Sequence, residues 1–136
     1  MSILKNYNVI YAQSGEKALE LLAKNDFDLI LLDVIMPLMD GYHVCSKIKE
    51  NEKTKNIPII FLTVKDDEKD IVKGFDLGAV DYITKPFYSE VLLKRVEVHL
   101  KIARLMHELE HINLNLNKTV EEQVEQIRQK DEIIIQ

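Results

Sequence analysis

The stretch that decides the fold is Asp28-Leu29-Ile30-Leu31-Leu32-Asp33-Val34-Ile35-Met36-Pro37-Leu38-Met39-Asp40-Gly41. Residues 29–32 are an apolar run between polar residues and turn formers, which predicts a strand buried on both faces, as in a parallel sheet. Asp33 then lies at the carboxyl end of that strand, where open α/β sheets place their ligands. Pro37 disfavours helical backbone at Met36, and Asp40-Gly41 turns the chain into the next element. Taken alone, Asp33 is better interpreted as a solvated strand-end residue or a helix cap.

The composition is that of a soluble globular protein. The 136 residues are 46% hydrophobic and 30% charged, with a net charge of −5, and the length suits one domain plus an appendage. Lys and Arg are scattered among the acidic residues, so no nucleic-acid footprint is visible. No apolar run reaches the length of a membrane span, and no signal-peptide core is present. Cys45 is the single cysteine and is read as a packed small hydrophobe, so the expected compartment is the reducing cytoplasm.

Strand and helix patterns alternate four times along the chain. Strands are expected at residues 8–12, 29–33, 58–63 and 79–84, and helices are expected to begin near Ser14, Asp40, Asp66 or Asp67, and Ser89. The last helical pattern contains no Gly or Pro through to Gln136. This order predicts an α/β fold with a parallel sheet and right-handed crossovers.

Three successive strands end on a polar side chain: Asp33, Thr63 and Lys85. Because the carboxyl ends of parallel strands meet at one edge of a sheet, we expect a carboxylate, a hydroxyl and an ammonium to converge there. A carboxylate can accept a phosphoryl group, and a hydroxyl and an ammonium supply the hydrogen-bond donor and the counter-charge that this group needs.

From about residue 7 to about residue 105, the sequence resembles the receiver domains of two-component response regulators. The resemblance rests on Asp33 followed by Met36-Pro37 and Asp40-Gly41, on Phe61-Leu62-Thr63, and on Gly78-Ala79-Val80-Asp81-Tyr82-Ile83-Thr84-Lys85-Pro86-Phe87. The separations are also those of the family: 30 residues from Asp33 to Thr63 and 22 from Thr63 to Lys85.

The resemblance implies a flavodoxin-like, doubly wound parallel sheet and assigns roles to individual residues. Asp33 is implied as the phosphoacceptor, Thr63 and Tyr82 as switch residues, and Lys85 as the phosphate partner. The Lys85–Pro86 bond is expected to be cis. The implied partners are a histidine kinase or a phosphotransfer protein, with no nucleic acid and no membrane, and the domain is not expected to be an enzyme.

The family begins with a strand that this chain lacks. Receivers start with an apolar strand that ends in two or three acidic residues, and these hold Mg²⁺ beside the phosphoacceptor. Here residues 1–7 look like the end of the first helix, and no acidic pair precedes Asn8. The later pair Asp66-Asp67 is read as helix capping. The missing strand is central in the family order, between residues 8–12 and 29–33, so its loss is expected to expose strand edges.

The missing acidic pair affects the expected chemistry. Asp33 and the backbone carbonyl of Ile35 are the implied Mg²⁺ ligands that remain, so binding is expected to be weak or absent, and phosphorylation of Asp33 is expected to be impaired. Three explanations stay open: a fragment that has lost its first residues, strand exchange or pairing between two copies, and a degenerate receiver.

The last helix extends past the expected receiver, which we place at residues 1–104, into a coiled coil at residues 105–136. A heptad repeat puts His99, Met106, Asn113, Val120, Ile127 and Ile134 at a positions and Ile102, Leu109, Leu116, Gln123 and Lys130 at d positions. Asn113 at an a position favours a parallel dimer in register. The alternative is a solitary charged helix that frays at its end.

The extended helix resembles the signalling helices that connect input domains to an output module. Residues 129–136 resemble the segment that precedes the phosphorylatable-histidine helix of some sensor kinases, which implies a multidomain parent such as a receiver-linked histidine kinase.

A competing motif lies on the same helix. His107-Glu108-Leu109-Glu110-His111 matches H-E-x-x-H, the zinc-protease signature. A catalytic zinc site needs a third protein ligand and a shielded cleft, and both histidines fall on outer heptad positions. A solvated helix face is therefore favoured over adventitious metal binding and over a zinc hydrolase.

Two function classes follow from the sequence. The first is a phosphoacceptor module that relays the change at Asp33 through the C-terminal helix, and the second is a phosphorylation-independent dimerisation scaffold. The sequence does not name the kinase, the stimulus or the output domain.

Overall fold

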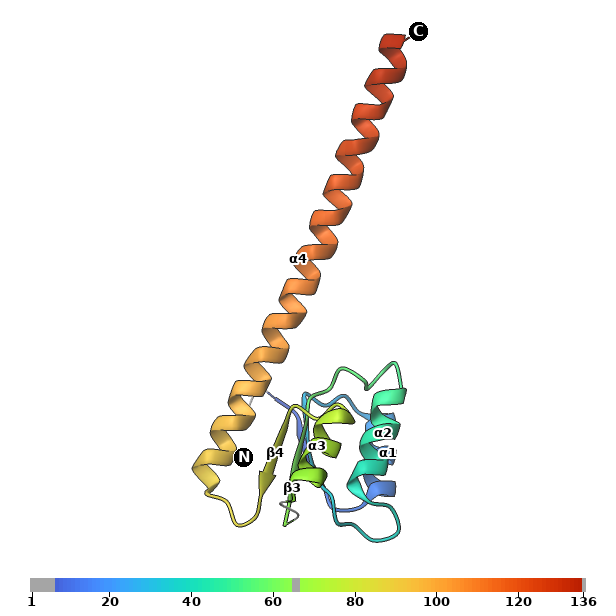
Figure 1. Ribbon diagram of the computed structural model, residues 1–136. Helices are drawn as coiled ribbons and strands as arrows, with labels where there is room; N and C mark the ends of the chain where they lie inside the picture. Colours follow the sequence, from blue (N-terminus) through green and yellow to red (C-terminus); the bar gives the residue numbers. More distant parts are fainter. Residues whose placement is uncertain (1–6, 65–66, 136) are drawn as a thin grey trace. The chain divides into compact units, whose positions relative to one another are not determined.

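The computed structural model describes residues 7–64 and 67–135, with side chains as far as residue 130 (Figure 1). The expectations for residues 1–6 and for Asp66 lie outside the described residues. The chain divides into two compact units, Met1–Lys101 and Ile102–Gln136. The domain boundary expected after residue 104 stays a prediction.

Strands and helices alternate through the first unit, and the last helix continues into the second. The elements are β1 (Val9–Ala12), α1 (Gly15–Lys24), β2 (Leu29–Asp33), α2 (Gly41–Glu50), β3 (Ile59–Thr63), α3 (Glu68–Asp76), β4 (Asp81–Thr84) and α4 (Ser89–Ile135). The expected helix to the end of the chain is thus continuous through Ile135.

The four strands form one parallel sheet in the order β1-β2-β3-β4. The predicted parallel α/β fold is confirmed. The strand starts differ slightly, because β4 begins at Asp81 and not at residue 79. The backbone N–H of Ala79 still donates to the Gly74 carbonyl at the end of α3, at 3.2 Å, so the ladder begins later.

The prediction of exposed strand edges between β1 and β2 is wrong, because these two strands pair directly. Val9 pairs with Leu29 and Ala12 with Leu32. Just before the two strands begin, the Asp28 N–H donates to the Asn8 carbonyl at 2.7 Å, and the Asn8 N–H donates to Asp28 Oδ2 at 2.8 Å. The backbone N–H and C=O groups on the facing edges of β1 and β2 thus hydrogen-bond to each other and are not left exposed. The sheet is therefore continuous across its four strands.

Each face of the sheet carries its own hydrophobic core. Helices α1, α2 and α3 cover one face, and the first turns of α4 cover the other (Figure 1). The first core includes Ile30, Leu32, Val44, Ile48, Ile59, Phe61 and Tyr82. The second includes Leu29, Leu31, Ile60, Leu62, Ile83, Leu92, Val96 and Leu100. Because strand side chains alternate between faces, the apolar run 29–32 supplies both cores, and this accounts for its lack of polar residues.

The N-caps predicted from the sequence are confirmed only in part. Asp40 caps α2, with Oδ1 accepting the His43 N–H at 2.8 Å. Ser14 and Asp67 occupy the N-cap positions of α1 and α3, but neither side chain makes a capping hydrogen bond. Their expected capping bonds are therefore absent, although both helices begin where predicted.

Gly41 fixes the start of α2 against the end of β2. Its N–H donates to the Val34 carbonyl at 2.8 Å. A Cβ added at Gly41 would overlap the Asp33 carbonyl oxygen and lie 2.8 Å from Val34 Cα. Only glycine permits this approach of two backbone segments, and the approach sets the direction of the chain just after Asp33.

We predict that Gly41→Ala lowers the free energy of unfolding by about 3 kcal/mol, because the added methyl group must push two backbone segments apart. Denaturant unfolding measures the change. The control is His43→Ala on the exposed side of the same helix, which should change stability by about 0.5 kcal/mol or less. An unchanged midpoint for Gly41→Ala would contradict the proposed close approach.

Candidate functional site

The side chains of Asp33 and Lys85 meet at the carboxyl edge of the sheet. Asp33 ends β2, and Lys85 follows β4 directly. Lys85 Nζ lies 2.9 Å from Asp33 Oδ2, and the two side chains are 33% and 14% exposed. The ion pair joins residues from opposite sides of β3. The pair is partly exposed, and the Asp33 carboxylate is the more buried of the two side chains.

Both carboxylate oxygens of Asp33 are held by donors. Oδ2 accepts from Lys85, and Oδ1 accepts the backbone N–H of Ile35 at 3.0 Å. The hydrogen bond to Asp33, followed by its negative charge, raises the pKa of the Lys85 ammonium against the opposing effect of burial. The site therefore presents an oriented carboxylate beside a fixed positive charge.

Thr63 lies between Asp33 and Lys85 in the sheet. It ends β3 and is fully buried. Its backbone carbonyl accepts the Lys85 N–H at 2.8 Å. Asp33 pairs in register with Leu62, so Thr63 is one residue farther along its strand. Alternation places its side chain on the face of the sheet that Phe61 and Tyr82 share. Of the three predicted strand-end side chains, the structure thus joins Asp33 to Lys85, with Thr63 linked through the backbone.

Tyr82 points into the core and ends at a second tyrosine. Its hydroxyl lies 3.2 Å from the hydroxyl of Tyr42 on α2. Tyr42 donates to the Asp70 carbonyl of α3 at 3.0 Å, so its oxygen is free to accept the proton of Tyr82. The Phe61 ring contacts both, with ring centroids 5.3 Å from Tyr42 and 5.9 Å from Tyr82. The ring of Tyr82 is therefore held between two helices and the central strands.

Gly74 provides the space for the Tyr82 ring. A Cβ added at Gly74 would lie 3.0 Å from Tyr82 Cδ2 and 3.2 Å from Phe61 Cδ2. This is tighter than ordinary van der Waals contact, so a larger residue would press on the inward orientation of the ring.

Tyr11 is a site residue that the sequence analysis missed. Tyr11 lies on β1 and pairs in register with Leu31 on β2. Asp33 comes two residues after Leu31 on the same strand, so Tyr11, Leu31 and Asp33 are on the same face of the sheet. Its phenol contributes, after Asp33, to raising the pKa of Lys85, and Gln13 Nε2 donates to its hydroxyl at 3.3 Å. Period-2 alternation was visible in the sequence, but the sequence analysis expected an unfilled gap between residues 8–12 and 29–33, where the structure pairs β1 directly with β2.

Comparison with known proteins identifies the arrangement. The family model described as "Response regulator receiver domain" matches residues 2–97. The chain belongs to this receiver family. A probable cyclic di-GMP phosphodiesterase of Vibrio cholerae is 46% identical over 118 residues, which are 87% of this chain and 26% of that protein. The chain thus spans about a quarter of this curated relative.

Solved structures show the same receiver fold. A putative response regulator from Chloroflexus aurantiacus is 40% identical with a TM-score of 0.63, over 66% of this chain and 74% of that one. The signal receiver domain of a signal transduction histidine kinase from Syntrophus aciditrophicus is 37% identical with a TM-score of 0.62, over 71% and 74%. Receivers of this kind are signalling modules that interact with histidine kinases or phosphotransfer proteins.

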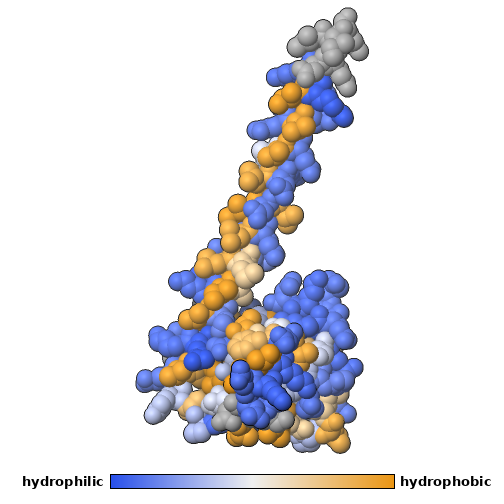
Figure 2. Space-filling model, viewed as in Figure 1, coloured by the Kyte–Doolittle hydropathy of each residue, from blue (hydrophilic) through white to orange (hydrophobic). Residues whose placement is uncertain are grey.

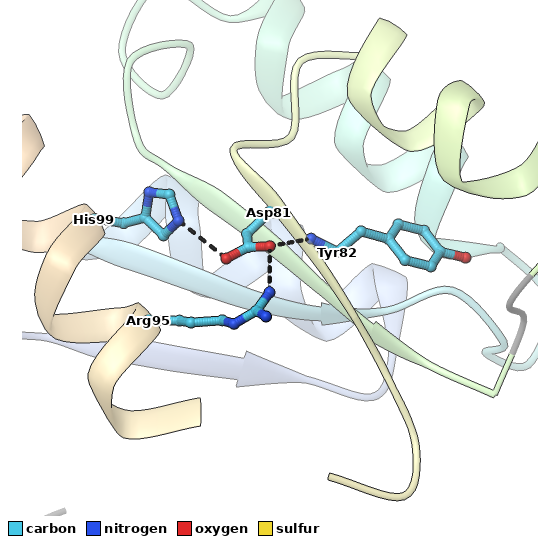
Figure 3. A network of polar contacts seen from close by, with 4 residues as sticks. All are labelled: Asp81, Tyr82, Arg95 and His99. Carbon is cyan, nitrogen blue, oxygen red and sulfur yellow. Dashed lines mark hydrogen bonds and ion pairs between the residues drawn. The ribbon is translucent and has the colours of Figure 1, made fainter. Parts of the chain in front are cut away.

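In this receiver, one carboxylate links the inward-pointing tyrosine to α4 (Figure 3). Asp81 Oδ1 accepts the Tyr82 N–H at 2.8 Å and lies 3.0 Å from a guanidinium nitrogen of Arg95. Asp81 Oδ2 lies 3.1 Å from His99 Nε2. Because neighbouring strand residues face opposite sides of the sheet, Tyr82 contacts α2 and α3 while Asp81 contacts α4.

Receiver domains bind Mg²⁺ at their phosphorylation site. Here Asp33 and the Ile35 carbonyl are the available oxygen donors of the expected set, and both Asp33 oxygens already accept hydrogen bonds. Among residues 7–64 and 67–135, no three His, Cys, Asp or Glu side chains are grouped to hold a metal ion. Mg²⁺ takes about six oxygen ligands, several of them waters, so this donor set leaves most of the coordination to water, and weak or absent binding stays a prediction.

The zinc-protease motif of α4 has no third ligand within the described part of the chain. His107 and His111 are both exposed, and Asn115 Nδ2 lies 3.3 Å from His111 Nε2. This favours the solvated helix face over a zinc centre.

In the same described region, no helix is both long and apolar enough to cross a membrane.

We predict that Tyr42→Phe weakens the inward position of Tyr82, because it removes the hydroxyl acceptor 3.2 Å away. The expected results are a changed ¹⁹F NMR signal for Tyr82 in 3-fluorotyrosine-labelled protein and a loss of about 1 kcal/mol of stability. Gly74→Ala should shift the same signal, because its methyl group presses on the ring.

The matched control is Tyr88→Phe, whose side chain is 81% exposed. It should leave the Tyr82 signal in place, and Tyr82→Phe assigns that signal. An identical Tyr82 signal in wild type and Tyr42→Phe would show that the hydroxyl pair does not hold the ring.

Proposed function

We propose that this receiver is a phosphoacceptor module of a two-component system, with Asp33 as the acceptor and a histidine kinase or phosphotransfer protein as the donor. The observation that carries the proposal is the Asp33–Lys85 pair at the carboxyl edge of a receiver sheet, 2.9 Å apart and partly exposed. Asp33 supplies the nucleophilic oxygen, and Lys85 supplies the positive charge that a phosphoryl group requires.

The transfer proposed at Asp33 is a displacement at phosphorus. An Asp33 carboxylate oxygen attacks the phosphorus of a phosphohistidine, so an O–P bond forms while the N–P bond breaks. The departing imidazole nitrogen keeps the electron pair and takes a proton from water. Lys85 then pairs with the new phosphoryl oxygens, and the Ile35 N–H continues to orient the remaining carboxyl oxygen. Thr63 and Tyr82 are the proposed switch residues, and the Lys85–Pro86 peptide bond is cis.

The proposed relay starts at β4 and continues along α4. A movement of Tyr82 changes the backbone position of Asp81, and Asp81 contacts Arg95 and His99 on α4. Residues beyond 104 are the proposed coiled coil, which pairs two copies and connects to an output module in a longer parent protein. The proposed location is the cytoplasm.

An alternative function is a phosphorylation-independent dimerisation scaffold. The observation that favours it lies in the second unit, where apolar side chains such as Leu109, Leu116 and Ile127 are about 60% exposed. A partner helix would cover these side chains whether or not Asp33 is phosphorylated.

We predict that acetyl phosphate and Mg²⁺ phosphorylate Asp33 in only a minor fraction of the protein. The carboxylate and Lys85 are in place, but the donor set holds Mg²⁺ weakly. Intact-mass spectrometry measures the fraction, and Asp33→Asn should carry no phosphoryl group. Asp26→Asn, an exposed carboxylate outside the site, is the matched control and should match wild type.

The outcomes separate the proposals. No adduct on wild type, even with a panel of phosphorylated histidine donors, would overturn the phosphoacceptor function and leave the scaffold. Complete phosphorylation by acetyl phosphate would contradict the weak Mg²⁺ site.

We also predict that phosphorylation strengthens self-association, because the change at Tyr82 and Asp81 reaches α4. Sedimentation velocity, with the phosphorylated fraction measured by intact mass, should show a faster-sedimenting population that grows with that fraction in wild type and is absent in Asp33→Asn. A dimer of equal strength in both proteins under both conditions would favour the scaffold.

A further inference from the structure

The second unit, Ile102–Gln136, presents an apolar stripe that has no partner among the described residues. Figure 2 shows hydrophobic side chains following one another along the helix on the face in view. The half-exposed side chains on this stripe are Ile102, Leu105, Met106, Leu109, Ile112, Leu116, Val120, Val124 and Ile127. At about 100° per residue, these positions lie within about 120° of the helix circumference, which is the width of a face that packs on another helix.

The first part of the stripe follows one repeat, which we call the first seam: Ile102, Leu105, Leu109, Ile112 and Leu116. Its members are separated by three, four, three and four residues, the spacing of alternating a and d positions. Continued at the same spacing, the first seam would reach Thr119, Gln123 and Gln126. All three are polar, so this repeat ends at Leu116.

The second part follows a repeat displaced by one residue, which we call the second seam: Val120, Val124 and Ile127. These residues are separated by four and three. Continued backward, the repeat would reach Asn117, Asn113 and Glu110, which are polar. Each seam is therefore apolar only in its own half, and the second seam is displaced by one residue, or about 100° around the axis, from the positions that the continued first repeat would occupy.

An uninterrupted heptad places polar side chains in the core of both halves. Its a positions include Asn113 in the first half, and its d positions include Gln123 in the second. It would also leave Leu105, Ile112 and Val124 outside the interface, although each is apolar and 44–59% exposed. A change of repeat between Leu116 and Val120 brings all of them inside.

We infer that a second copy of this chain packs on the stripe as a parallel two-stranded coil whose core changes from the first seam to the second between Leu116 and Val120. This rests on the proposed function, because it specifies how the proposed dimer pairs. The occupant is a second copy because alternating three- and four-residue spacing is what an identical helix matches when aligned in parallel. No charged side chain lies in either seam to oppose self-pairing.

The change of repeat has a mechanical consequence. Inserted or deleted residues in a heptad pattern locally change the winding of a coiled coil. If the first half of both helices rotates so that it faces its partner with the same side as the second seam, Leu105 and Ile112 move out of the core. The segment 116–120 is thus the place where two packing arrangements meet, and a rotation imposed on the first half is opposed there by the second.

Disulfide trapping of variants that each carry one cysteine in addition to the buried Cys45 tests the inference on the full chain. Neighbouring positions form matched pairs: Leu105→Cys with Met106→Cys, Ile112→Cys with Asn113→Cys, and Val124→Cys with Gln123→Cys. Oxidation in native buffer should cross-link the first member of each pair at least threefold faster. The parent protein, whose Cys45 is fully buried with its thiol pKa raised by burial to about 11, should not cross-link.

Each outcome is decisive. Faster cross-linking at Met106→Cys, Asn113→Cys and Gln123→Cys would establish an uninterrupted heptad, which overturns the change of repeat and preserves the dimer. Equal rates within every pair would also overturn it. An absence of cross-links at all six positions, with a monomer in sedimentation, would overturn the dimer itself and leave phosphorylation of Asp33 to be judged by intact mass.

Discussion

The ion pair between Asp33 and Lys85 is the contact on which the site depends. It joins the ends of β2 and β4 across β3, so it exists only when all three strands pair in parallel and in register. A partly exposed pair of this kind contributes little to stability. Its consequence is chemical, because the carboxylate is oriented by the Ile35 N–H and paired with a cation before the proposed phosphoryl transfer.

Strand β4 connects the two faces of the sheet. Tyr82 extends into the aromatic contacts of Tyr42 and Phe61, while the adjacent Asp81 contacts Arg95 and His99 on α4. One strand therefore links Lys85, the proposed phosphate partner, to the buried tyrosine and to the helix that continues into the second unit. This gives the proposed relay a covalent and hydrogen-bonded route that needs no large rearrangement of the core.

The two units differ in how far their apolar side chains are buried. The sheet buries its apolar residues within one chain, whereas the stripe of the second unit stays half exposed. An isolated helix gains little from such a stripe, because most helix stability in proteins comes from packing an apolar face. The proposed second chain would cover this stripe, and the proposed change of repeat between Leu116 and Val120 describes how the two helices would pack.

The sequence by itself determined the strand-helix alternation and the family. Apolar periodicity and the polar ends Asp33, Thr63 and Lys85 are local properties that a parallel sheet brings to one edge. Only the tertiary structure decided that β1 pairs directly with β2, that Tyr11 lies on the face of Asp33, and that Tyr42 meets Tyr82. Those contacts join segments far apart in the chain, and they depend on which strand edges and side chains are left to satisfy one another after the core has packed. Spacing along one sequence does not contain that information.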